Sequence, residues 1–261
     1  MTIRITWWGH ASATVEIGGV QLLTDPLLTA RLAHLRRIGS PVPPAEATRP
    51  DVVLISHLHH DHLHLPSLRL VRDDAAVLVP AGGGRLLRAD AAVPAARVHE
   101  VAVGDSIELG GVSVRAVPAA HDGRRLPGSR HRGPALGYLI EHGGVRVWFA
   151  GDTGLFAGLG ELAPVDLALI PVGGWGPTLG AGHLDPDQAA RAAELVQARH
   201  AVPIHYGTFW PIGLRHLHPA GFHRSFLDPG PRFARAAAHR CPNTVVHLLD
   251  CGASAELDLG P

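Results

Sequence analysis

Residues 51–64 read Asp-Val-Val-Leu-Ile-Ser-His-Leu-His-His-Asp-His-Leu-His, an apolar run followed at once by imidazoles and a carboxylate. The run over 51–55 predicts a buried strand, so the polar cluster follows the carboxyl end of that strand. His57 and His59 are two residues apart and point to the same side of an extended chain. Asp61 and His62 follow in the turn and can reach a second point nearby. This density of ligands is typical of a Zn, Mn or Fe site, although 19 His in the chain also allow a solvated His-rich loop.

Three single residues further along the chain are candidates for the same site. His121, Asp152 and His205 each come directly after an apolar run that predicts a strand. Each has an ordinary explanation when taken alone: a lone loop histidine is usually polar surface, and Asp152 could cap a helix beginning at Leu155. Because all of them lie in turns at strand ends, the predicted strands can bring them to one rim. The sequence therefore favours one shared site.

The spacing His57-x-His59-x-Asp61-His62 resembles the signature of the metallo-β-lactamase superfamily. The downstream segments resemble one branch of it, which includes ascorbate-6-phosphate lactonase and the N-acylphosphatidylethanolamine phospholipase D enzymes. The resemblance extends from residues 7–10, Trp-Trp-Gly-His, to about Phe209. It implies a four-layer αββα sandwich of the α/β class, with the metal site at the rim of the two sheets.

The same resemblance implies a site for two divalent metal ions, with Zn as the first choice and Mn or Fe as alternatives. One ion would take three imidazoles, those of His57, His59 and His121. The other would take Asp61, His62 and His205, and Asp152 would bridge the two together with a hydroxide. Two divalent cations, two carboxylates and one hydroxide leave a net positive charge, which favours a small anionic substrate.

Asp61 and His183 are the catalytic candidates. The family resemblance places a histidine that faces the substrate at His183, where it would stabilise negative charge or help to protonate the leaving group. The alternative is a capping or orienting role, because His183 lies just before a clear helix start. That start, Asp185-Pro186-Asp187-Gln188, has the pattern of a capping box and predicts a helix that runs to about Arg199.

Further candidates for orienting a ligand or contacting the substrate are His10, Asp25, Arg125 and Trp175. His10 is equally well explained as a plain loop histidine. Asp25 could simply start a turn before Pro26, but we favour a role in orienting a ligand histidine. Arg125 belongs to a basic loop over residues 123–134, which could bind the oxygens of an anionic substrate or be an ordinary solvated loop.

Length and composition favour one domain over residues 1–261, and the resemblance implies that it is a hydrolase domain. The chain is 46% apolar and 18% charged, which allows a large core, and no Ser/Gly linker divides it. Gly-Gly turns that predict hairpins alternate with predicted helices, which gives an α/β fold. We expect an irregular surface loop over 27–50, a last helix over 231–239 and a last strand over 244–248. A Pro-rich loop region is expected over 211–231, where the irregular spacing of His216, His218 and His223 indicates surface, although residues 210–214 could line a substrate pocket.

Several classes of function find no support in the composition. Lys plus Arg and Asp plus Glu are 23 each, so no nucleic-acid partner is expected. Cys241 and Cys251 are too few for a disulfide framework, and we expect free, buried thiols. Without a signal peptide or a run long enough to cross a bilayer, the expected location is the cytoplasm and no transmembrane segment is predicted. A homo-oligomer is compatible with the sequence.

Three functions are consistent with the predicted site. The first is a metal-dependent hydrolase that uses a metal-bridging hydroxide on a phosphoester or phosphodiester, and the second is a lactonase acting on a sugar or phosphosugar lactone. The third is an iron-dependent oxygen or sulfur oxidoreductase. Di-iron oxygen reductases of the resembling fold usually carry Glu at the second ligand position, whereas this chain carries His59, so the third function is disfavoured.

Overall fold

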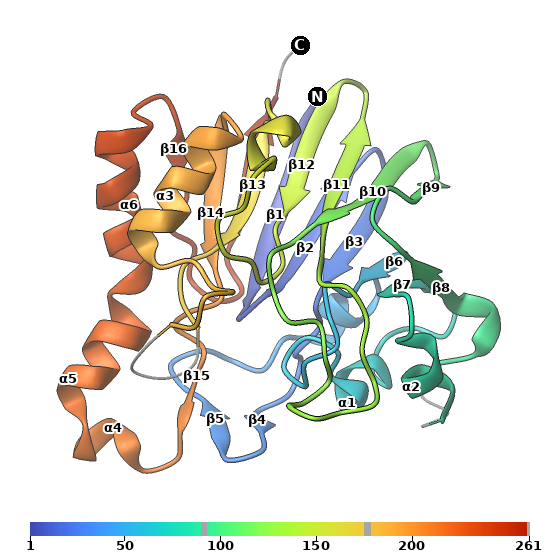
Figure 1. Cartoon of the computed structure of the whole chain (residues 1–261), viewed down its shortest axis with the longest axis horizontal. Helices are drawn as coiled ribbons and strands as arrows, with labels where there is room; N and C mark the ends of the chain where they lie inside the picture. Colours follow the sequence, from blue (N-terminus) through green and yellow to red (C-terminus); the bar gives the residue numbers. More distant parts are fainter. Residues whose placement is uncertain (90–92, 175–178, 260–261) are drawn as a thin grey trace.

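The computed structural model describes residues 1–89, 93–174 and 179–259. Two seven-stranded sheets form its centre (Figure 1). The first contains, in spatial order, β17 (Ser254–Asp258), β1 (Thr2–Gly9), β2 (Ser12–Ile17), β3 (Val20–Thr24), β6 (Val52–Leu54), β7 (Ala76–Pro80) and β8 (Val98–Val101). The second contains β16 (Val245–Val246), β14 (His200–Ile204), β13 (Leu167–Pro171), β12 (Val145–Phe149), β11 (Leu136–His142), β10 (Val112–Pro118) and β9 (Ser106–Leu109).

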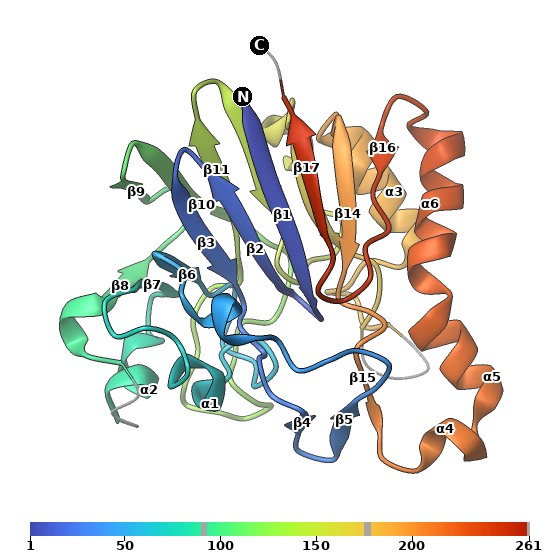
Figure 2. The ribbon, with the colours of Figure 1, turned by 180° about the vertical axis from the view of Figure 1, so that it is seen from behind.

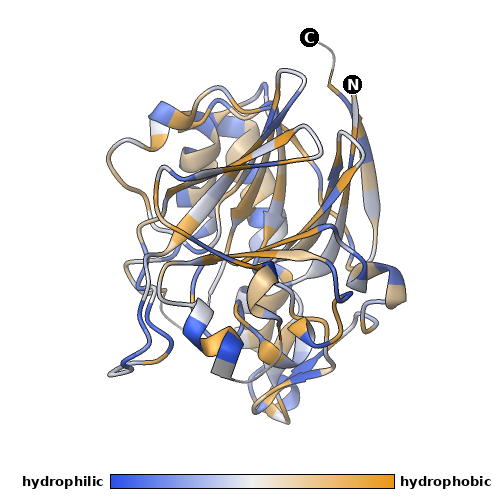
Figure 3. Cartoon of the chain, turned by 90° about the vertical axis from the view of Figure 1, so that its right-hand side faces the viewer, coloured by the Kyte–Doolittle hydropathy of each residue, from blue (hydrophilic) through white to orange (hydrophobic). Residues whose placement is uncertain are grey.

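The main hydrophobic core lies between the two sheets. Ile5 and Trp7 of the first sheet belong to the same buried cluster as Tyr138 and Phe149 of the second. Hydrophobic stretches run along the strands of both sheets (Figure 3). Burial of this apolar surface is the main force that holds the two sheets face to face.

Helices lie on the outer side of the second sheet and beside β6 and β7 of the first sheet, whereas β17, β1 and β2 face the viewer in Figure 2. The helices of the described residues are α1 (Leu65–Leu68), α2 (Gly84–Ala89), α3 (Pro186–Leu195), α4 (Leu214–Leu217), α5 (Pro219–Phe222) and α6 (Pro229–Arg240), together with the 3₁₀ turns η1 (Ala45–Thr48), η2 (Ala95–Arg97) and η3 (Leu159–Leu162) and the π-turn η4 (His223–Leu227). Ala190 of α3 and Phe233 of α6 pack with Trp148 on the second sheet. Leu68 of α1 and Leu87 of α2 pack with Val77 on the first. The predicted four-layer α/β sandwich is thereby confirmed.

Strand direction brings the important loops to one rim. In the first sheet β1 and β3 are each antiparallel to β2, and β6 is parallel to β3, so β1, β3 and β6 run the same way. In the second sheet β10 and β12 are each antiparallel to β11, and β13 and β14 continue parallel to β12. The carboxyl ends of four strands in this sheet therefore share one edge. Loops that leave these ends carry three of the predicted metal ligands, and the loop after β6 of the first sheet carries the other four.

Local sequence signals account for the hairpins and for the start of α3. The Gly-Gly turns join β2 to β3, β9 to β10 and β11 to β12, as predicted. Asp185 accepts from the Gln188 amide at 2.8 Å, and the Gln188 side chain accepts from the Asp185 amide at 3.1 Å, so the capping box is present. The helix ends at Leu195 rather than near Arg199, because Gln197 adopts a left-handed conformation that leads the chain into β14.

The prediction of an irregular loop over residues 27–50 was wrong in part. Two short strands, β4 (Arg31–Leu32) and β5 (Leu35–Arg37), form a third sheet with β15 (Phe209–Pro211). Leu27, Leu28 and Leu35 are buried there. Strands of two or three residues show no readable alternation, and β5 finds its partner far away in the sequence, so no local signal revealed this sheet.

The C-terminal part also differs from expectation. The last strand was predicted over 244–248, but only Val245–Val246 pair, and the unpredicted β17 adds an edge to the first sheet beside β1. The loop region expected over 211–231 instead contains the end of β15, then α4, α5 and η4, and the start of α6. Both cysteines are free thiols, as expected, but they are half-buried and not fully buried. Among the described residues, no helix has the length and apolar character needed to cross a bilayer. A single domain over residues 1–261 stays a prediction.

Candidate metal centre

All seven predicted ligands come together at the rim. His57, His59, Asp61 and His62 lie in the loop after β6, and the other three each follow a strand of the second sheet: His121 after β10, Asp152 after β12 and His205 after β14. Their side-chain atoms form adjoining groups, in each of which the potential ligand atoms lie within 4.8 Å of one another. The site therefore lies across the seam between the two sheets.

The first group consists of three imidazoles, His57, His59 and His121. The His57 Nε2 atom lies 2.9 Å from His59 Nδ1, and His121 Nε2 lies 3.2 Å from the same atom. Ligand atoms around a tetrahedral zinc, at about 2.0–2.1 Å from the metal, lie about 3.3 Å from each other. The spacing of the three nitrogens is therefore close to that of ligands around one ion.

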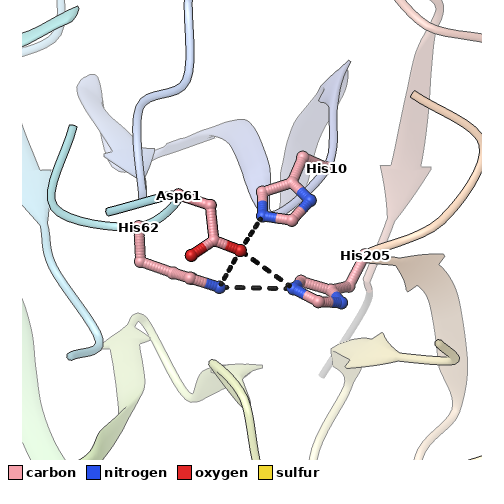
Figure 4. Close-up of side chains that lie close together, drawn as sticks. All are labelled: His10, Asp61, His62 and His205. Atoms are coloured by element: carbon pink, nitrogen blue, oxygen red, sulfur yellow. Dashed lines mark hydrogen bonds and ion pairs between the residues drawn. The ribbon is translucent and has the colours of Figure 1, made fainter. Parts of the chain in front are cut away.

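The second group contains Asp61, His62, His205 and also His10 (Figure 4). His62 Nε2 lies 3.2 Å from His205 Nε2 and 3.6 Å from Asp61 Oδ2. His10 Nε2 lies 3.1 Å from that same oxygen. The structure thus places His10 against the Asp61 carboxylate, where it either orients Asp61 or adds a fourth ligand atom.

Asp152 lies between these groups and is almost fully buried, with 3% of its side chain exposed. Its Oδ2 atom is 3.3 Å from His62 Nε2, and its Oδ1 atom is 3.3 Å from His205 Nε2. It also belongs to a group with His121 and His183. Asp152 Oδ1 has no hydrogen-bond partner among the described residues, although it is buried. A buried carboxylate oxygen without a donor suits coordination to a cation.

The imidazoles are held so that one nitrogen remains available. His121 Nδ1 donates to the Gly182 carbonyl at 2.8 Å, and His205 Nδ1 donates to the Gly173 carbonyl at 3.1 Å. A carbonyl can only accept, so the proton of each neutral ring lies on Nδ1 and Nε2 keeps its lone pair. Ligand histidines in metalloproteins are usually fixed in this way.

Asp25 fixes two more of the imidazoles. Its carboxylate accepts from the Ser56 amide at 2.7 Å, from the Ser56 hydroxyl at 2.5 Å and from His62 Nδ1 at 2.7 Å. The Ser56 hydroxyl, whose proton points to Asp25, accepts in turn from His57 Nδ1 at 2.9 Å. These contacts agree with the orienting role that we favoured for Asp25.

The electrostatics of the site favour neutral imidazoles and charged carboxylates. Burial lowers the pKa of His57, His59 and His121, and it lowers the pKa of His205 to about 3. Burial would raise the pKa of Asp61 and Asp152, but the surrounding histidines hold both well below the usual range.

His62 behaves differently because carboxylates surround it. Burial opposes its charged form, yet Asp152, Asp61 and Asp25 raise its pKa well above the usual range. This concentration of negative charge can be neutralised by a proton on His62 or by a divalent cation. The donor set therefore fits a cation.

His183 lies at the solvent side of Asp152. Its Nε2 atom is 3.5 Å from Asp152 Oδ2, its ring centroid is 4.8 Å from that of His121, and 23% of its side chain is exposed. The hydrogen bond to Asp152 raises the pKa of His183, although burial opposes the shift. His183 is therefore placed beside the candidate ligands with access to solvent, as expected for a residue that faces a substrate.

Arg125 is buried against the loop that carries the ligands. Its guanidinium donates to the carbonyls of Leu58 at 2.9 Å and Leu63 at 2.6 Å, and it also contacts His60 Nδ1 at 2.8 Å. Of the two roles considered for this residue, orientation of the metal loop matches these contacts. Trp175, the remaining candidate, lies outside the described residues.

Two residues that support the site were missed in the sequence. The buried Thr208 hydroxyl accepts from the His10 amide at 2.7 Å and donates to the Tyr206 carbonyl at 2.9 Å. Arg37 donates to the Trp8 carbonyl at 2.8 Å and so fixes the turn that carries His10. A threonine or an arginine in a loop usually lies on the surface, so the sequence does not single out these two residues. Only the tertiary structure reveals their partners.

Comparison with known proteins agrees with this geometry. A family model for the beta-lactamase superfamily domain matches residues 21–206. A UPF0173 metal-dependent hydrolase of Methanopyrus kandleri is 36% identical over 219 residues, which cover 80% of this chain and 86% of that protein. One from Pyrobaculum arsenaticum is 36% identical over 213 residues, which cover 79% and 85% of the two chains.

Solved structures show the same architecture. Igni18, described as a novel metallo hydrolase from Ignicoccus hospitalis, is 25% identical with a TM-score of 0.73, and the match covers 100% of both chains. CmlA, a diiron beta-hydroxylase from Streptomyces venezuelae, has a TM-score of 0.69 at 21% identity and covers 98% of this chain and 54% of that one. The second likeness is one of fold alone.

This chain belongs to the metallo-β-lactamase superfamily. Within that superfamily it is a metal-dependent hydrolase, related over most of its length to the UPF0173 proteins.

Proposed function

We propose that this hydrolase cleaves a phosphoester or phosphodiester of a small anionic substrate at a centre for two divalent metal ions. The observation that carries the proposal is the pair of ligand groups at one rim with the buried Asp152 carboxylate between them. His57, His59 and His121 would hold one ion. Asp61, His62 and His205 would hold the other, and Asp152 would contact both.

Divalent metal ions bound at such a centre lower the pKa of water to give hydroxide near neutral pH and polarise the substrate oxygen. Zn is our first choice because imidazole and carboxylate donors suit it, while Mn and Fe accept the same atoms. The cations outweigh the two carboxylates and a hydroxide in charge, so the site attracts an anion.

The chain's own residues prepare the site for the reaction. Asp25 and the carbonyls of Gly173 and Gly182 fix the rings of His62, His205 and His121 before the substrate binds. Such preorganisation avoids reorganisation during the reaction. His183 lies 3.5 Å from Asp152 with 23% of its side chain exposed, and its N–H would turn from that carboxylate to donate to a substrate oxygen or to the leaving group.

A substrate panel with metal analysis tests the proposal. The protein is loaded with Zn or Mn, its metal content is measured by mass spectrometry, and it is assayed on p-nitrophenyl phosphate, bis(p-nitrophenyl) phosphate and a set of lactones. Two metal ions per chain with hydrolysis of a phosphate ester support the proposal. Hydrolysis of the lactones alone would favour the lactonase alternative, and iron with oxygen uptake but no hydrolysis would favour an oxidoreductase.

A further inference from the structure

An apolar pocket of about 330 Å³ lies directly beside the candidate metal centre. His10 and His205, which belong to the second ligand group, also line this pocket. Its other walls come from β15, α4 and η4, including Phe209, Trp210 and Phe226. We call it the aromatic pocket. A molecule held in it would reach the metal centre without leaving the pocket.

The aromatic walls are fixed by contacts among themselves. Phe226 stacks on Phe222, with ring centroids 4.5 Å apart and planes inclined by 19°. Trp210 meets Phe226 edge to face at 6.0 Å, and the Arg37 guanidinium lies 4.9 Å from the centre of the Phe209 ring. A pocket whose walls are already ordered binds a ligand at a low cost in conformational entropy.

The polar groups of the pocket select against a cationic ligand. The lining residues that the structure describes include no carboxylate, and Arg224 is exposed at the side formed by η4. His218 uses its Nδ1 atom to accept from the Gly221 amide at 3.2 Å, so it caps the amino end of α5. The pocket therefore suits a neutral apolar group, with room for negative charge beside Arg224.

The size of the pocket limits the group that it can hold. A closed apolar cavity of about 150 Å³ takes up benzene. At about 330 Å³, the aromatic pocket is roughly twice as large and fits a bicyclic ring system such as naphthyl. Burial of such a ring contributes strongly to affinity, since roughly 25 cal/mol is gained per Å² of apolar surface removed from water.

We propose that the substrate carries an apolar, aromatic-sized group next to the bond that is cleaved, and that the aromatic pocket binds this group. The inference rests on the proposed hydrolase function for the position of the scissile bond, and it adds the substrate class. It predicts aryl or similar apolar esters as substrates in place of simple alkyl phosphates or unsubstituted sugar phosphates.

The test compares inert ligands that differ only in the apolar group. Binding of 1-naphthylphosphonate and methylphosphonate to the zinc-loaded protein is measured by calorimetry, and 1-naphthoate and acetate form a second pair with another head group. We expect the naphthyl ligand of each pair to bind roughly ten-fold or more tightly. Equal affinity within both pairs, or no binding of either naphthyl ligand, would overturn the proposal.

Helix α4 offers a matched pair of variants. Leu214 lines the pocket, whereas Leu217 on the same helix does not and has 79% of its surface exposed. We expect Leu214→Trp to fill the pocket and remove the preference for naphthyl, while Leu217→Trp retains it. Equal loss in both variants would show that the naphthyl ligands bind elsewhere and would overturn the proposal.

Binding of the ligand pairs and hydrolysis of phosphate esters are measured separately, so a failure of this inference can be distinguished from a failure of the proposed function. If the naphthyl preference depends on Leu214 but no phosphate ester is hydrolysed, the aromatic pocket stands and the phosphoesterase function fails. If phosphate esters are hydrolysed at rates that do not depend on an aryl group, and the binding preference is absent, the phosphoesterase stands and the pocket proposal fails.

Discussion

The Nδ1 atom of His62 lies 2.7 Å from Oδ2 of Asp25, and both side chains are completely buried. This contact fixes which His62 nitrogen faces the candidate metal centre. Asp25 comes from the end of β3 and His62 from the loop after β6, so two neighbouring strands set the orientation of one ring.

Asp25→Asn tests this relationship. The amide keeps the shape but loses the charge that stabilises the His62 N–H, so we expect metal affinity to fall about 10–100-fold. Zinc titration with a competing chelator measures the change. Asp74→Asn, at a carboxylate with 69% of its side chain exposed, serves as the control and should bind zinc normally. Unchanged affinity in Asp25→Asn would show that the contact does not support metal binding.

His59→Ala and Asp152→Ala remove candidate ligands directly. We expect each to reduce kcat/KM by more than about 100-fold, which exceeds the effect of changing residues that only orient ligands. Metal content should fall while the circular dichroism spectrum stays that of the folded protein, because the core between the sheets is untouched. The exposed His99 on β8 gives the control variant His99→Ala. Full activity in either ligand variant would contradict the ligand assignment.

Thr208→Val tests the support of His10. The change leaves the buried His10 amide without its acceptor, and we expect the free energy of unfolding to fall by about 1–3 kcal/mol. Thr208→Ser keeps the hydroxyl and should lose less. Urea denaturation of both variants measures the difference. Equal losses would mean that the methyl group of Thr208, and not its hydrogen bonds, stabilises the turn.

The pair His200 and His247 predicts a pH dependence of stability far from the metal centre. Their ring nitrogens lie 2.9 Å apart, and burial lowers the pKa of both. Arg199 lowers the pKa of His200 further, while Asp166 opposes this shift. Because the folded protein binds these protons less readily than the unfolded chain, stability is full above the ordinary histidine pKa of 6.5 and falls below it.

Urea midpoints measured between about pH 7.5 and 5 test this dependence, since the ordinary histidine pKa lies within that range. We expect the fall in midpoint on acidification to be smaller when both histidines are replaced in His200→Gln/His247→Gln. His239→Gln, at an exposed position on α6, should keep the full fall. The same pH dependence in all three proteins would exclude a contribution from the pair.

The site could be predicted from sequence to the extent that its residues stand at strand ends. His57, His59, Asp61 and His62 are contiguous enough to form a motif, and His121, Asp152 and His205 each follow a strand that reads clearly as apolar. Strand direction then brings them together. The positions of these residues in the fold could therefore be predicted. Burial patterns are local, and the direction of the strands restricts where their ends meet.

The supporting contacts could not be predicted, because their partners are distant in the chain. Thr208 reaches the turn at His10, and Phe209 pairs with Arg37 in the third sheet. Neither segment of such a pair contains a sequence pattern that predicts its partner. The aromatic pocket depends on the same long-range pairing. The sequence suggested that residues 210–214 could line a pocket, but it did not reveal η4, which provides Phe226.

The position of the ligands on both sheets has a mechanical consequence. A cation bound by residues after β6 of the first sheet and by residues after β10, β12 and β14 of the second would link the two sheets at this rim. Amide hydrogen exchange at that rim should then slow on loading with zinc, whereas the opposite end, around the Gly-Gly hairpins, should exchange at an unchanged rate. A bound metal ion would therefore hold the two sheets together at one end of the molecule, and its removal would loosen only that end.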